Sequence, residues 1–341
     1  MNNTRGISVI VCCYNSTLRL PETIRHLAQQ QVPAHLPWEI WIVNNASSDN
    51  TAQVAINEWQ KYSSAGIEYN VVDEPVPGLF NARRKGIDCA RYEYLLFCDD
   101  DNWLNPSYLA TAFEIMQANP KIGVLGGCGE ILPEEPVTMN ETLLSQLNAN
   151  GPQHWAATDH WVYGAGMTIR KSIFMELAEH GWLQITTGRT GSNFLSGEDA
   201  EICFMFYLCG HQIVADDRLT FKHLIPVKRQ SIKTIINMAF WLSYSYYFLY
   251  GYIAMINKEP VSLNDLSTRL LKSHSISLLR SVQAVVIQAL KKRKRPTLEQ
   301  RCTVLRHYGM VSSIIKNRKK VINHQQHIQQ VLNSVKQAAN E

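Results

Sequence analysis

Short apolar runs alternate with helical patterns along this chain, and this alternation limits the possible folds more than any other feature of the sequence. The helical patterns include residues 20–30 and 50–62. Apolar runs separated by helices are typical of strands covered on both faces, in a sheet whose strands are mostly parallel. The sequence therefore predicts an α/β fold with helices flanking the sheet. Its predicted strands are residues 7–13, 39–43, 67–72, 94–98 and 122–127.

A polar cluster follows each of the first four predicted strands. In sheets of this kind, ligands bind beyond the carboxyl ends of the strands. We therefore expect these clusters to converge on one site. They are residues 14–16, 44–50, 73–78 and 99–101.

The fourth cluster is three consecutive carboxylates, Asp99, Asp100 and Asp101. Adjacent carboxylates at a partly buried strand end repel one another unless a cation lies near them. Mg²⁺ or Mn²⁺ fits best, because these ions take carboxylate oxygens together with water and substrate phosphates. An alternative is that the acids favour a helix start, since Asn105 before Pro106 is a good N-cap and first-turn pair.

Six segments of the chain resemble the sequence blocks of the family 2 glycosyltransferases, in the same order and spacing, over about residues 5–225. This family has the GT-A fold. The resemblance implies transfer of a sugar from a nucleoside diphosphate sugar to an acceptor hydroxyl, with inversion at the anomeric carbon. The segments are ISVIVCCYN, VNNASSDNT, PGLFNARRKGI, LLFCDDDNWL, YGAGMTIRKSIF and FLSGEDAEICFMFYLCG.

The resemblance assigns the acidic residues to two roles. Asp99 and Asp101, with Asp100 between them, resemble the family's DxD motif, which makes Asp101 the expected metal ligand and puts the other two acids on the nucleotide-sugar side. Asp199 resembles the catalytic base of the ED motif, with Glu198 beside it. Inverting transfer needs such a base to accept the proton of the attacking hydroxyl. Ser196 followed by Asp199 also resembles a capping box, so a structural role stays open.

Further residues of these segments are expected to bind the nucleotide sugar: Tyr14, Asn15, Asn44, Asp49 and Arg83. At Asn44 the family usually has an acid that accepts a hydrogen bond from uracil. An amide both donates and accepts, so the nucleotide base stays open. Asp49 has a second explanation, which is capping of the helix that follows it.

The resemblance puts Trp161, Tyr163 and Gly164 on the acceptor side, where aromatic rings stack on sugars and glycine allows close approach of the backbone. Core aromatic residues are the alternative. His223 lies where some related enzymes supply a further metal ligand, although a histidine in an apolar run also fits a protein core.

The charge of the chain changes sign near residue 227. Residues 1–227 carry 14 Lys and Arg against 25 Asp and Glu, whereas residues 228–341 carry 19 against 4. The sequence therefore predicts a catalytic domain over 1–227 and a basic helical module over 228–341. Within the module, residues 234–257 are uncharged and rich in tyrosine, which favours an interfacial or protein-buried helix over a membrane span.

Two cationic clusters, residues 291–296 and 316–320, suggest an anionic partner for the module. Membrane phosphates fit, and a lipid-linked acceptor would lie at such a surface. We expect no nucleic acid, because no nucleic-acid-binding fold accompanies the charge. An oligomer contact or a solvated surface stays open. The polar N-terminus lacks a secretory pattern and the cysteines form no CxxC pair, so we expect a cytoplasmic protein, peripheral at the inner face of the plasma membrane.

The sequence leaves three functions open. The first is an inverting, metal-dependent glycosyltransferase of bacterial polysaccharide or glycolipid assembly, acting on a sugar or lipid-linked saccharide. The second is a non-catalytic nucleotide-sugar-binding or membrane-binding protein on the same fold, and the third is a nucleotidyltransferase. The presence of both Asp101 and Asp199 favours the enzyme, because a binding protein has little need of a base.

Overall fold

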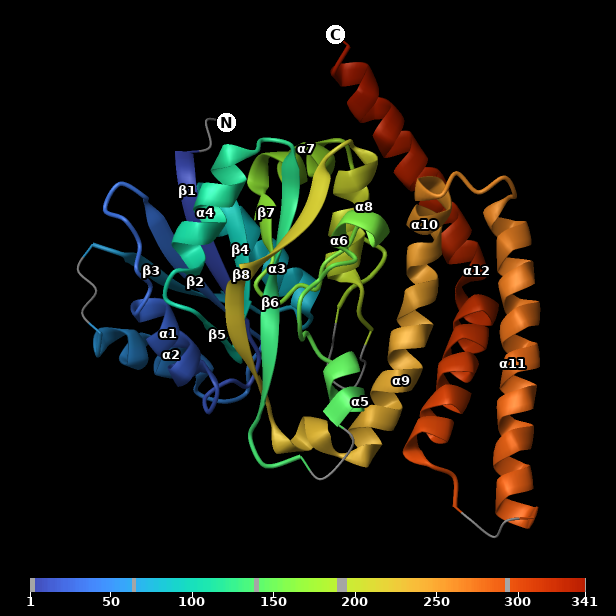
Figure 1. The fold of residues 1–341 in the computed structure, drawn as a ribbon. Helices are drawn as coiled ribbons and strands as arrows, with labels where there is room; N and C mark the ends of the chain where they lie inside the picture. The colour runs from blue at the N-terminus through green and yellow to red at the C-terminus, as the bar shows by residue number, and fades with distance from the viewer. Residues whose placement is uncertain (1–3, 63–65, 138–140, 189–194, 292–294, 341) are drawn as a thin grey trace.

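The computed structural model describes residues 4–62, 66–137, 141–188, 195–291 and 295–340. At its centre is an eight-stranded sheet with the order β3-β2-β1-β4-β7-β6-β8-β5 (Figure 1). Five of its strands, β1, β2, β3, β4 and β6, are those that the alternation predicts. The strands are β1 (Thr4–Cys13), β2 (Trp38–Asn45), β3 (Glu68–Glu74), β4 (Tyr92–Asp99), β5 (Asn102–Leu104), β6 (Ile122–Pro133), β7 (Thr168–Arg170) and β8 (Gln212–Ile225).

The two halves of the sheet differ in strand direction. Strands β3, β2, β1 and β4 run parallel, as predicted. Strand β7 is antiparallel to both β4 and β6, β8 is parallel to β6, and β5 is antiparallel to β8. The predicted α/β class is confirmed, and the complete sheet is mixed because the short strands β5 and β7 reverse its direction.

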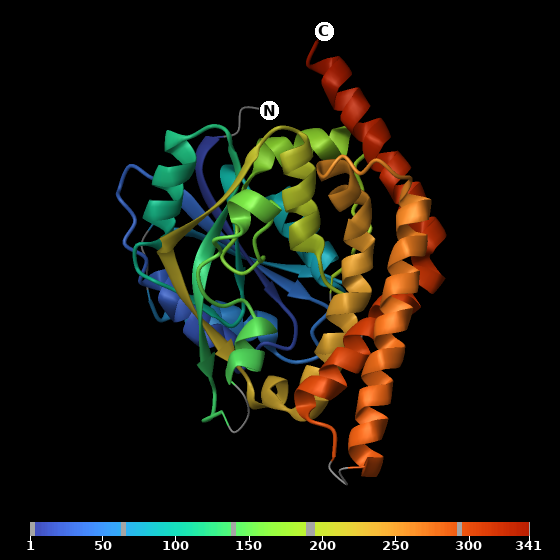
Figure 2. The same ribbon diagram turned by 45° about the vertical axis from the view of Figure 1, so that its right-hand side comes forward.

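Helices cover both faces of the sheet (Figures 1 and 2). On one face, α1 and α4 bury apolar side chains spaced three or four residues apart, such as Leu20, Ile24 and Leu27. On the other face lie α3, α7 and α8. The bounds are α1 (Leu20–Ala28), α2 (Thr51–Gln60), α3 (Leu79–Cys89), α4 (Tyr108–Ala118), α5 (Glu141–Gln146), α6 (Ala156–Asp159), α7 (Lys171–Glu179) and α8 (Glu198–Leu208).

Helices follow the last strand and form a layer beside the sheet. The uncharged segment 234–257 is divided between α9, a 3-10 turn and α10, and its Tyr247 and Tyr252 are fully buried in the protein. Among the described residues, no helix has both the length and the apolar character needed to cross a membrane. The elements are η1 (Val227–Gln230), α9 (Ile232–Tyr246), η2 (Tyr247–Leu249), α10 (Tyr250–Ile256), α11 (Leu263–Lys291) and α12 (Leu298–Ala338).

A buried polar cluster joins this helical layer to α8. Glu201 of α8, fully buried, accepts a hydrogen bond of 2.8 Å from the hydroxyl of Tyr252 in α10 and lies 3.2 Å from His324 Nε2 in α12. The same carboxylate accepts the backbone N–H groups of Ile185 and Thr186. Residues 228–341 thus share their core with the sheet layer, and the predicted boundary at residue 227 stays a prediction.

Candidate active site

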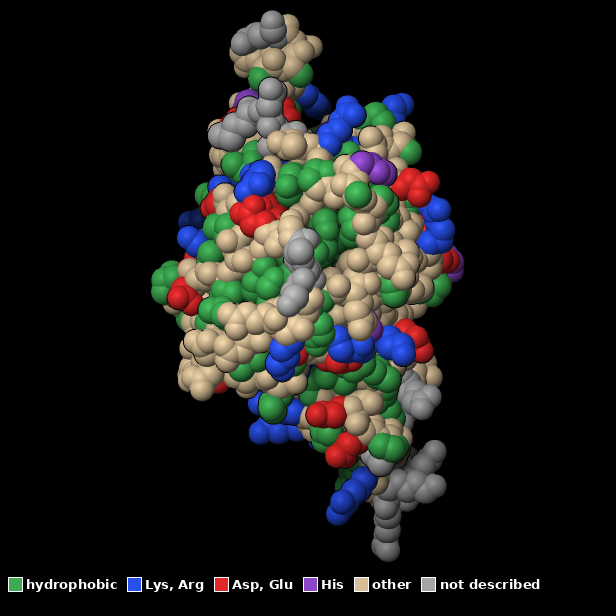
Figure 3. All heavy atoms as spheres, turned by 90° about the vertical axis from the view of Figure 1, so that its left-hand side faces the viewer, with side chains coloured by type: hydrophobic (Ala, Val, Ile, Leu, Met, Phe, Trp, Pro, Cys, Tyr) green, Lys and Arg blue, Asp and Glu red, His purple; other side chains and the backbone are tan. Residues whose placement is uncertain are grey.

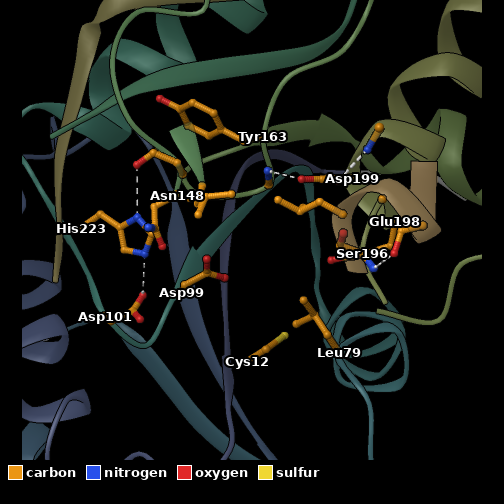
Figure 4. Close-up of a pocket in the computed structure, with 18 of the residues that line it drawn as sticks. Cys12, Leu79, Asp99, Asp101, Asn148, Tyr163, Ser196, Glu198, Asp199 and His223 are labelled. Carbon is orange, nitrogen blue, oxygen red and sulfur yellow. Dashed lines mark hydrogen bonds and ion pairs between the residues drawn. The ribbon is translucent and has the colours of Figure 1, made fainter. Parts of the chain in front are cut away.

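A cavity of about 1250 Å³ opens beyond the carboxyl ends of β1, β2 and β4, between the sheet and α9 (Figure 4). Its position agrees with the convergence of polar clusters expected from the sequence. Most of the predicted site residues line it: Tyr14, Arg83, Asp99, Asp100, Asp101, Trp161, Tyr163, Gly164, Glu198, Asp199 and His223. Asn15, Asn44 and Asp49 are not among its lining residues.

The three consecutive acids have different surroundings. The Asp100 carboxylate lies 2.6 Å from Arg19 Nη2 and also accepts a hydrogen bond from the Ser16 hydroxyl. Burial and the neighbouring Asp101 charge raise the pKa of Asp100, although Arg19 opposes them. Asp100 therefore ties the end of β4 to the start of α1, whereas the half-buried Asp99 extends into the cavity (Figure 4).

The alternative explanation of the acids as helix-start residues finds no support. Helix α4 begins at Tyr108 with Ser107 as its N-cap, so the prediction of Asn105 as the N-cap was wrong. Asn105 instead accepts a hydrogen bond of 3.0 Å from the Ser107 N–H, which makes a turn before the helix. Asp100 and Asp101 have their ion-pair partners in Arg19 and Arg229, away from this helix.

Asp101 and His223 come together at the end of the cavity nearest β5 and β8. The two strands pair Asn102 with His223, which brings His223 Nε2 to 3.7 Å from Asp101 Oδ1. His223 Nδ1 lies 3.1 Å from the carbonyl oxygen of Ala149. Burial lowers the pKa of His223 against the opposing charge of Asp101. The imidazole is therefore neutral at pH 7, with Nδ1 as the donor and Nε2 as the acceptor.

Arg229, from η1, completes this end of the cavity. Its Nη1 lies 3.3 Å from Asp101 Oδ2 and 3.2 Å from His223 Nε2. A cation thus already faces both residues that the sequence predicts as metal ligands. Arg229 lies in the short 3-10 helix η1, and its side chain is partly exposed, whereas the Asp101 side chain is buried.

The donor atoms at this end of the cavity are of the kinds that a hard divalent cation binds. Among the described residues, no three His, Cys, Asp or Glu side chains gather closely enough to hold a metal by themselves. Mg²⁺ and Mn²⁺ are commonly held by one or two protein side chains plus phosphate oxygens and water. The buried Asp101 carboxylate and the neutral His223 Nε2 supply a donor set of that kind.

Asp199 lies on the opposite side of the cavity, at the second residue of α8 (Figure 4). Its Oδ2 accepts a hydrogen bond of 2.7 Å from the N–H of Gly164, and its Oδ1 accepts one of 2.8 Å from the N–H of Ala200. Each carboxylate oxygen has a further lone pair available. The carboxylate is thus held in a fixed orientation at the N-terminus of α8.

Glu198 has a different partner from Asp199. Its Oε1 lies 3.3 Å from Nη1 of Arg83, and both side chains are more than nine-tenths buried. The Arg83 guanidinium also lies over the ring of Phe97, 5.1 Å from its centre. Of the two acids in the predicted ED motif, Glu198 is therefore engaged in a buried ion pair and Asp199 is held by backbone N–H groups.

The structure does not support the alternative of a capping box at Ser196 and Asp199. Helix α8 has Gly197 as its N-cap, at a φ of 111° that side chains rarely tolerate, and no side chain caps it. Ser196 instead donates its backbone N–H to the hydroxyl of Ser245 in α9, at 3.0 Å. The turn that orients Asp199 is therefore supported from the C-terminal helices.

The second polar cluster serves mainly to hold the site together. The Asn44 amide donates to Asp73 at 2.8 Å, and the Asn15 oxygen accepts from the N–H of Ser48 at 2.8 Å. Asp49 accepts from Thr17 and from the N–H of Thr51, the first residue of α2, which matches its alternative role at a helix start. Tyr14 is half-exposed at the cavity.

The residues predicted for the acceptor side lie along the loop before β7. Trp161 faces the cavity with Trp155, their ring centres 5.6 Å apart. The Tyr163 hydroxyl donates to the carbonyl of Gly151 at 2.9 Å and accepts from the N–H of Gly129, so it braces the loop against β6. Added atoms at Gly164 would meet Arg83, which explains a glycine there without a ligand.

Comparison with known proteins decides the family of this chain. The model of glycosyl transferase family 2 matches residues 8–178, which is half of the sequence. The chain belongs to glycosyl transferase family 2. This confirms the family that the six segments indicate. Together with the observed sheet and flanking helices, it also confirms the GT-A fold.

The chain is also similar to named proteins and to a solved structure. Two sequences of poly-beta-1,6-N-acetyl-D-glucosamine synthase from Staphylococcus epidermidis are 33% and 32% identical to it over 226 residues, 65% of this chain and 50% of each relative. The chain thus spans about half the length of these relatives. The solved structure of S. aureus TarS residues 1–349 in complex with UDP is 16% identical, covers 92% of this chain and 91% of that chain, and has a TM-score of 0.48.

Sequence reasoning missed three features of this glycosyl transferase family 2 site. Asn45, rather than Asn44, lines the cavity, because alternate residues of a strand point to opposite sides. Arg229 appears in the sequence only as one basic residue among several. The α9 residues Leu242 and Tyr246 also line the cavity, and only their uncharged, aromatic setting hinted that they cover a surface.

Proposed function

We propose that this protein transfers a sugar, with inversion, from a nucleoside diphosphate sugar to a hydroxyl of a saccharide acceptor. The observation that carries the proposal is the arrangement of one cavity: Asp101 and His223 lie at one end, and Asp199 lies at the other. A nucleoside diphosphate sugar also has two different ends: its negative charge lies on the two phosphates, and its reacting carbon lies in the sugar. The diphosphate of the donor would suit the end with Asp101 and His223, and the anomeric carbon of its sugar would lie towards Asp199.

On the donor side, Asp101 and His223 would hold Mg²⁺ or Mn²⁺. The metal, when bound, stabilises the charge that develops on the leaving diphosphate. Arg229 supplies a further cation beside the same residues and can pair with phosphate oxygens. Asp99, half-buried between the two ends of the cavity, suits a hydroxyl of the donor.

On the acceptor side, Asp199 would accept the proton of the attacking hydroxyl. The N–H groups of Gly164 and Ala200 fix both of its oxygens and leave one lone pair on each for the acceptor. Both hydrogen-bond donors are backbone N–H groups, whose positions do not depend on a side-chain rotamer. The Asp199 carboxylate would therefore keep its orientation when the substrate binds. General-base help of this kind is worth roughly 10²- to 10⁴-fold in rate.

The acceptor is proposed to be a growing polysaccharide or a glycolipid at the cytoplasmic face of a membrane. Trp161 and Tyr246 give this side of the cavity aromatic surface of the kind that packs on sugar rings. The curated relatives are named as synthases of a polysaccharide. Residues 228–341 carry the positive charge that would hold the protein near anionic lipid.

The two other functions are less well supported. Membership in glycosyl transferase family 2 favours glycosyl transfer over nucleotidyl transfer. A protein that only binds nucleotide sugars has no use for a carboxylate fixed by two N–H groups at the far end of the cavity from the cation site. The fixed carboxylate of Asp199 therefore favours an enzyme over a protein that only binds nucleotide sugars.

The test is a panel of nucleoside diphosphate sugars incubated with the purified protein in Mn²⁺ or in a chelator. We expect one donor to release its diphosphate in Mn²⁺, faster with a saccharide acceptor, and the product to have the inverted anomeric configuration by NMR. Asp88→Asn, on the exposed side of α3, serves as a control for loss of one carboxylate. Absence of donor binding, or a product that retains configuration, would contradict the proposal.

A further inference from the structure

The outer face of α11 is apolar and exposed over its second half. Leu279 and Leu290 keep 70% and 75% of their surface accessible. Side chains on this face recur at intervals of three and four residues, which places them along one side of the helix. The exposed apolar residues are Ile276, Leu279, Val282, Val286, Ile287 and Leu290. We call them the α11 stripe.

The opposite face of α11 is already covered by α12. His274 contacts His307 at 3.1 Å, and Gln288 accepts a hydrogen bond of 2.7 Å from Gln300. Leu270 packs into the core cluster that the two helices share. The α11 stripe is thus an additional apolar surface, and Figures 1 and 2 show α11 at the edge of the molecule, farther from the sheet than α9.

The charges around the α11 stripe are basic. Arg269, Lys272 and Arg280 are exposed on α11, and the helix contains no Asp or Glu after Asp265, whose carboxylate accepts a hydrogen bond from Ser262. By contrast, the face on the other side of the molecule carries acidic and basic side chains close to one another (Figure 3). The excess of basic over acidic side chains is therefore a feature of the α11 surface.

Helix α12 extends the basic surface beside the first turns of α11. Arg318 donates hydrogen bonds to Asn264 at 2.9 Å and to Thr268. Thr268 lies on the same face as Leu279 and Val286, since eleven and eighteen residues are close to three and five whole turns. Exposed Lys and Ile residues lie on either side of Arg318 in α12: Ile315, Lys316 and Lys319.

We propose that the α11 stripe rests on an anionic lipid surface, with its apolar side chains among the lipid chains and its flanking cations on the lipid phosphates. An apolar face bordered by Lys and Arg is the pattern of helices that lie in a membrane interface. The inference rests on the proposed location of the enzyme at a membrane and names the surface that makes the contact. The proposed contact lies outside residues 234–257, for which the sequence left an interfacial and a protein-buried helix open and whose Tyr247 and Tyr252 are fully buried.

A second copy of the chain is a poorer occupant of this face. Pairing of two α11 stripes would bring Arg269, Lys272 and Arg280 of one copy near the same residues of the other, and α11 has a single acid, Asp265 in its first turn, against these three cations. An anionic lipid surface satisfies the cations and the apolar side chains at once. The predicted cationic cluster at 291–296 falls partly outside the described residues and adds nothing to this argument.

The experiment is flotation of the full chain with vesicles of phosphatidylcholine alone, or mixed equally with phosphatidylglycerol. We expect binding to the mixed vesicles at low salt and weaker binding at high salt, because exposed charges are screened. The double variant Leu279→Glu/Leu290→Glu should lose about tenfold or more of this binding. Ile56→Glu, at an exposed position of α2, is the matched control and should bind like the wild type.

Further variants and measurements distinguish lipid binding from pairing of two copies and from the proposed function. Arg269→Gln/Arg280→Gln should weaken binding without changing helix content, which circular dichroism reports. Absence of wild-type binding to the mixed vesicles, or a wild-type dimer that the Glu variants dissociate, would overturn the proposal. Calorimetry with nucleotide sugar separates it from the proposed function, since the Glu variants should keep donor affinity. If the wild-type protein does not bind any nucleotide sugar, the proposed function is contradicted, whereas the proposed lipid contact is not affected.

Discussion

The backbone nitrogen of Gly164 lies 2.7 Å from Oδ2 of Asp199, and this hydrogen bond ties the loop before β7 to the start of α8. A Cβ at Gly164 would come within 2.5 Å of Arg83 Nη2 and 3.2 Å of the Asp199 Cβ. The position therefore controls two things together: the orientation of Asp199 and the packing of the buried Arg83–Glu198 pair.

Gly164→Ala should both destabilise the protein and slow transfer. Overpacking of a buried site typically costs about 1–3 kcal/mol, and relief of the clash would move Asp199 or Arg83. Thermal unfolding and the transfer rate measure the two effects. Gly251→Ala is the control, because its nearest neighbour would be at 3.4 Å and the residue is in a helix. A Gly164→Ala protein equal to the wild type in both would refute the importance of this contact.

Asp101→Asn should weaken donor binding only when Mn²⁺ is present. Loss of the carboxylate removes the charged partner for the cation, and we expect affinity to fall about tenfold or more, or about 1.4 kcal/mol. In a chelator, the variant and the wild type should bind the donor alike. Calorimetry under both conditions is the measurement. Unchanged donor affinity in Mn²⁺ would count against Asp101 as a metal ligand.

Tyr252→Phe should destabilise the fold through its effect on Glu201. The variant loses the 2.8 Å hydrogen bond to this fully buried carboxylate and leaves Trp182 without its acceptor. Such a loss costs about 1–3 kcal/mol. Urea unfolding followed by fluorescence and circular dichroism gives the value, with the half-exposed Tyr308→Phe as the control.

The same unfolding curves test the predicted boundary between residues 1–227 and 228–341. Because Glu201, Tyr252 and His324 link the sheet layer to the C-terminal helices, the two probes should report one shared transition. Two separate transitions would mean that the C-terminal module unfolds as an independent domain.

Asp49 should stabilise the protein above about pH 4 and lose that effect in acid. Burial acts to raise the pKa of Asp49, but hydrogen bonds from Thr51 and Thr17 outweigh it and lower the pKa. The charged form is thus favoured in the folded state, so its contribution is present above the unfolded pKa, about 3.9, and fades as pH falls through the folded pKa. Asp49→Ala should cost about 0.5–2 kcal/mol at pH 7.

The pH dependence of that difference is the check on Asp49. Urea unfolding of both proteins at pH 7 and near pH 3 should show a smaller difference in the more acidic buffer. Asp49→Asn should recover part of the loss at pH 7, because the amide oxygen still accepts a hydrogen bond. A difference that grows in acid would contradict the assigned sign.

Much of the fold was predictable because the strands that build the site are long and buried. Residues 94–98 of β4, for example, are apolar and lie in the core, and the acids that follow them mark the strand end. Strands β5 and β7 have three residues each, too few for a periodic pattern to appear. Strand β8 carries charged residues at 216–218 and 222, which hide its apolar alternation.

The site was predictable only where residues cluster in the sequence. Asp99 to Asp101 and Glu198 to Asp199 are adjacent residues with evident chemistry. Arg229 meets Asp101 through the path of β8 and η1, which no local pattern reveals. Asn105 and Ser196 are residue types that favour an N-cap, but the two helices begin later, with Ser107 and Gly197 as their N-caps, because the path of the chain rather than the residue type sets the helix start there.

The central claim is that Asp199 is the base of a glycosyl transfer, and Asp199→Asn tests it most directly. Asn can keep one hydrogen bond from Gly164 or Ala200 and fits a helix start, so the fold and donor affinity should survive. The account predicts a transfer rate lower by about 10²- to 10⁴-fold, measured with melting temperature and donor affinity on the same preparation. A stable, donor-binding Asp199→Asn enzyme that transfers at nearly the wild-type rate would contradict it and direct attention to Glu198.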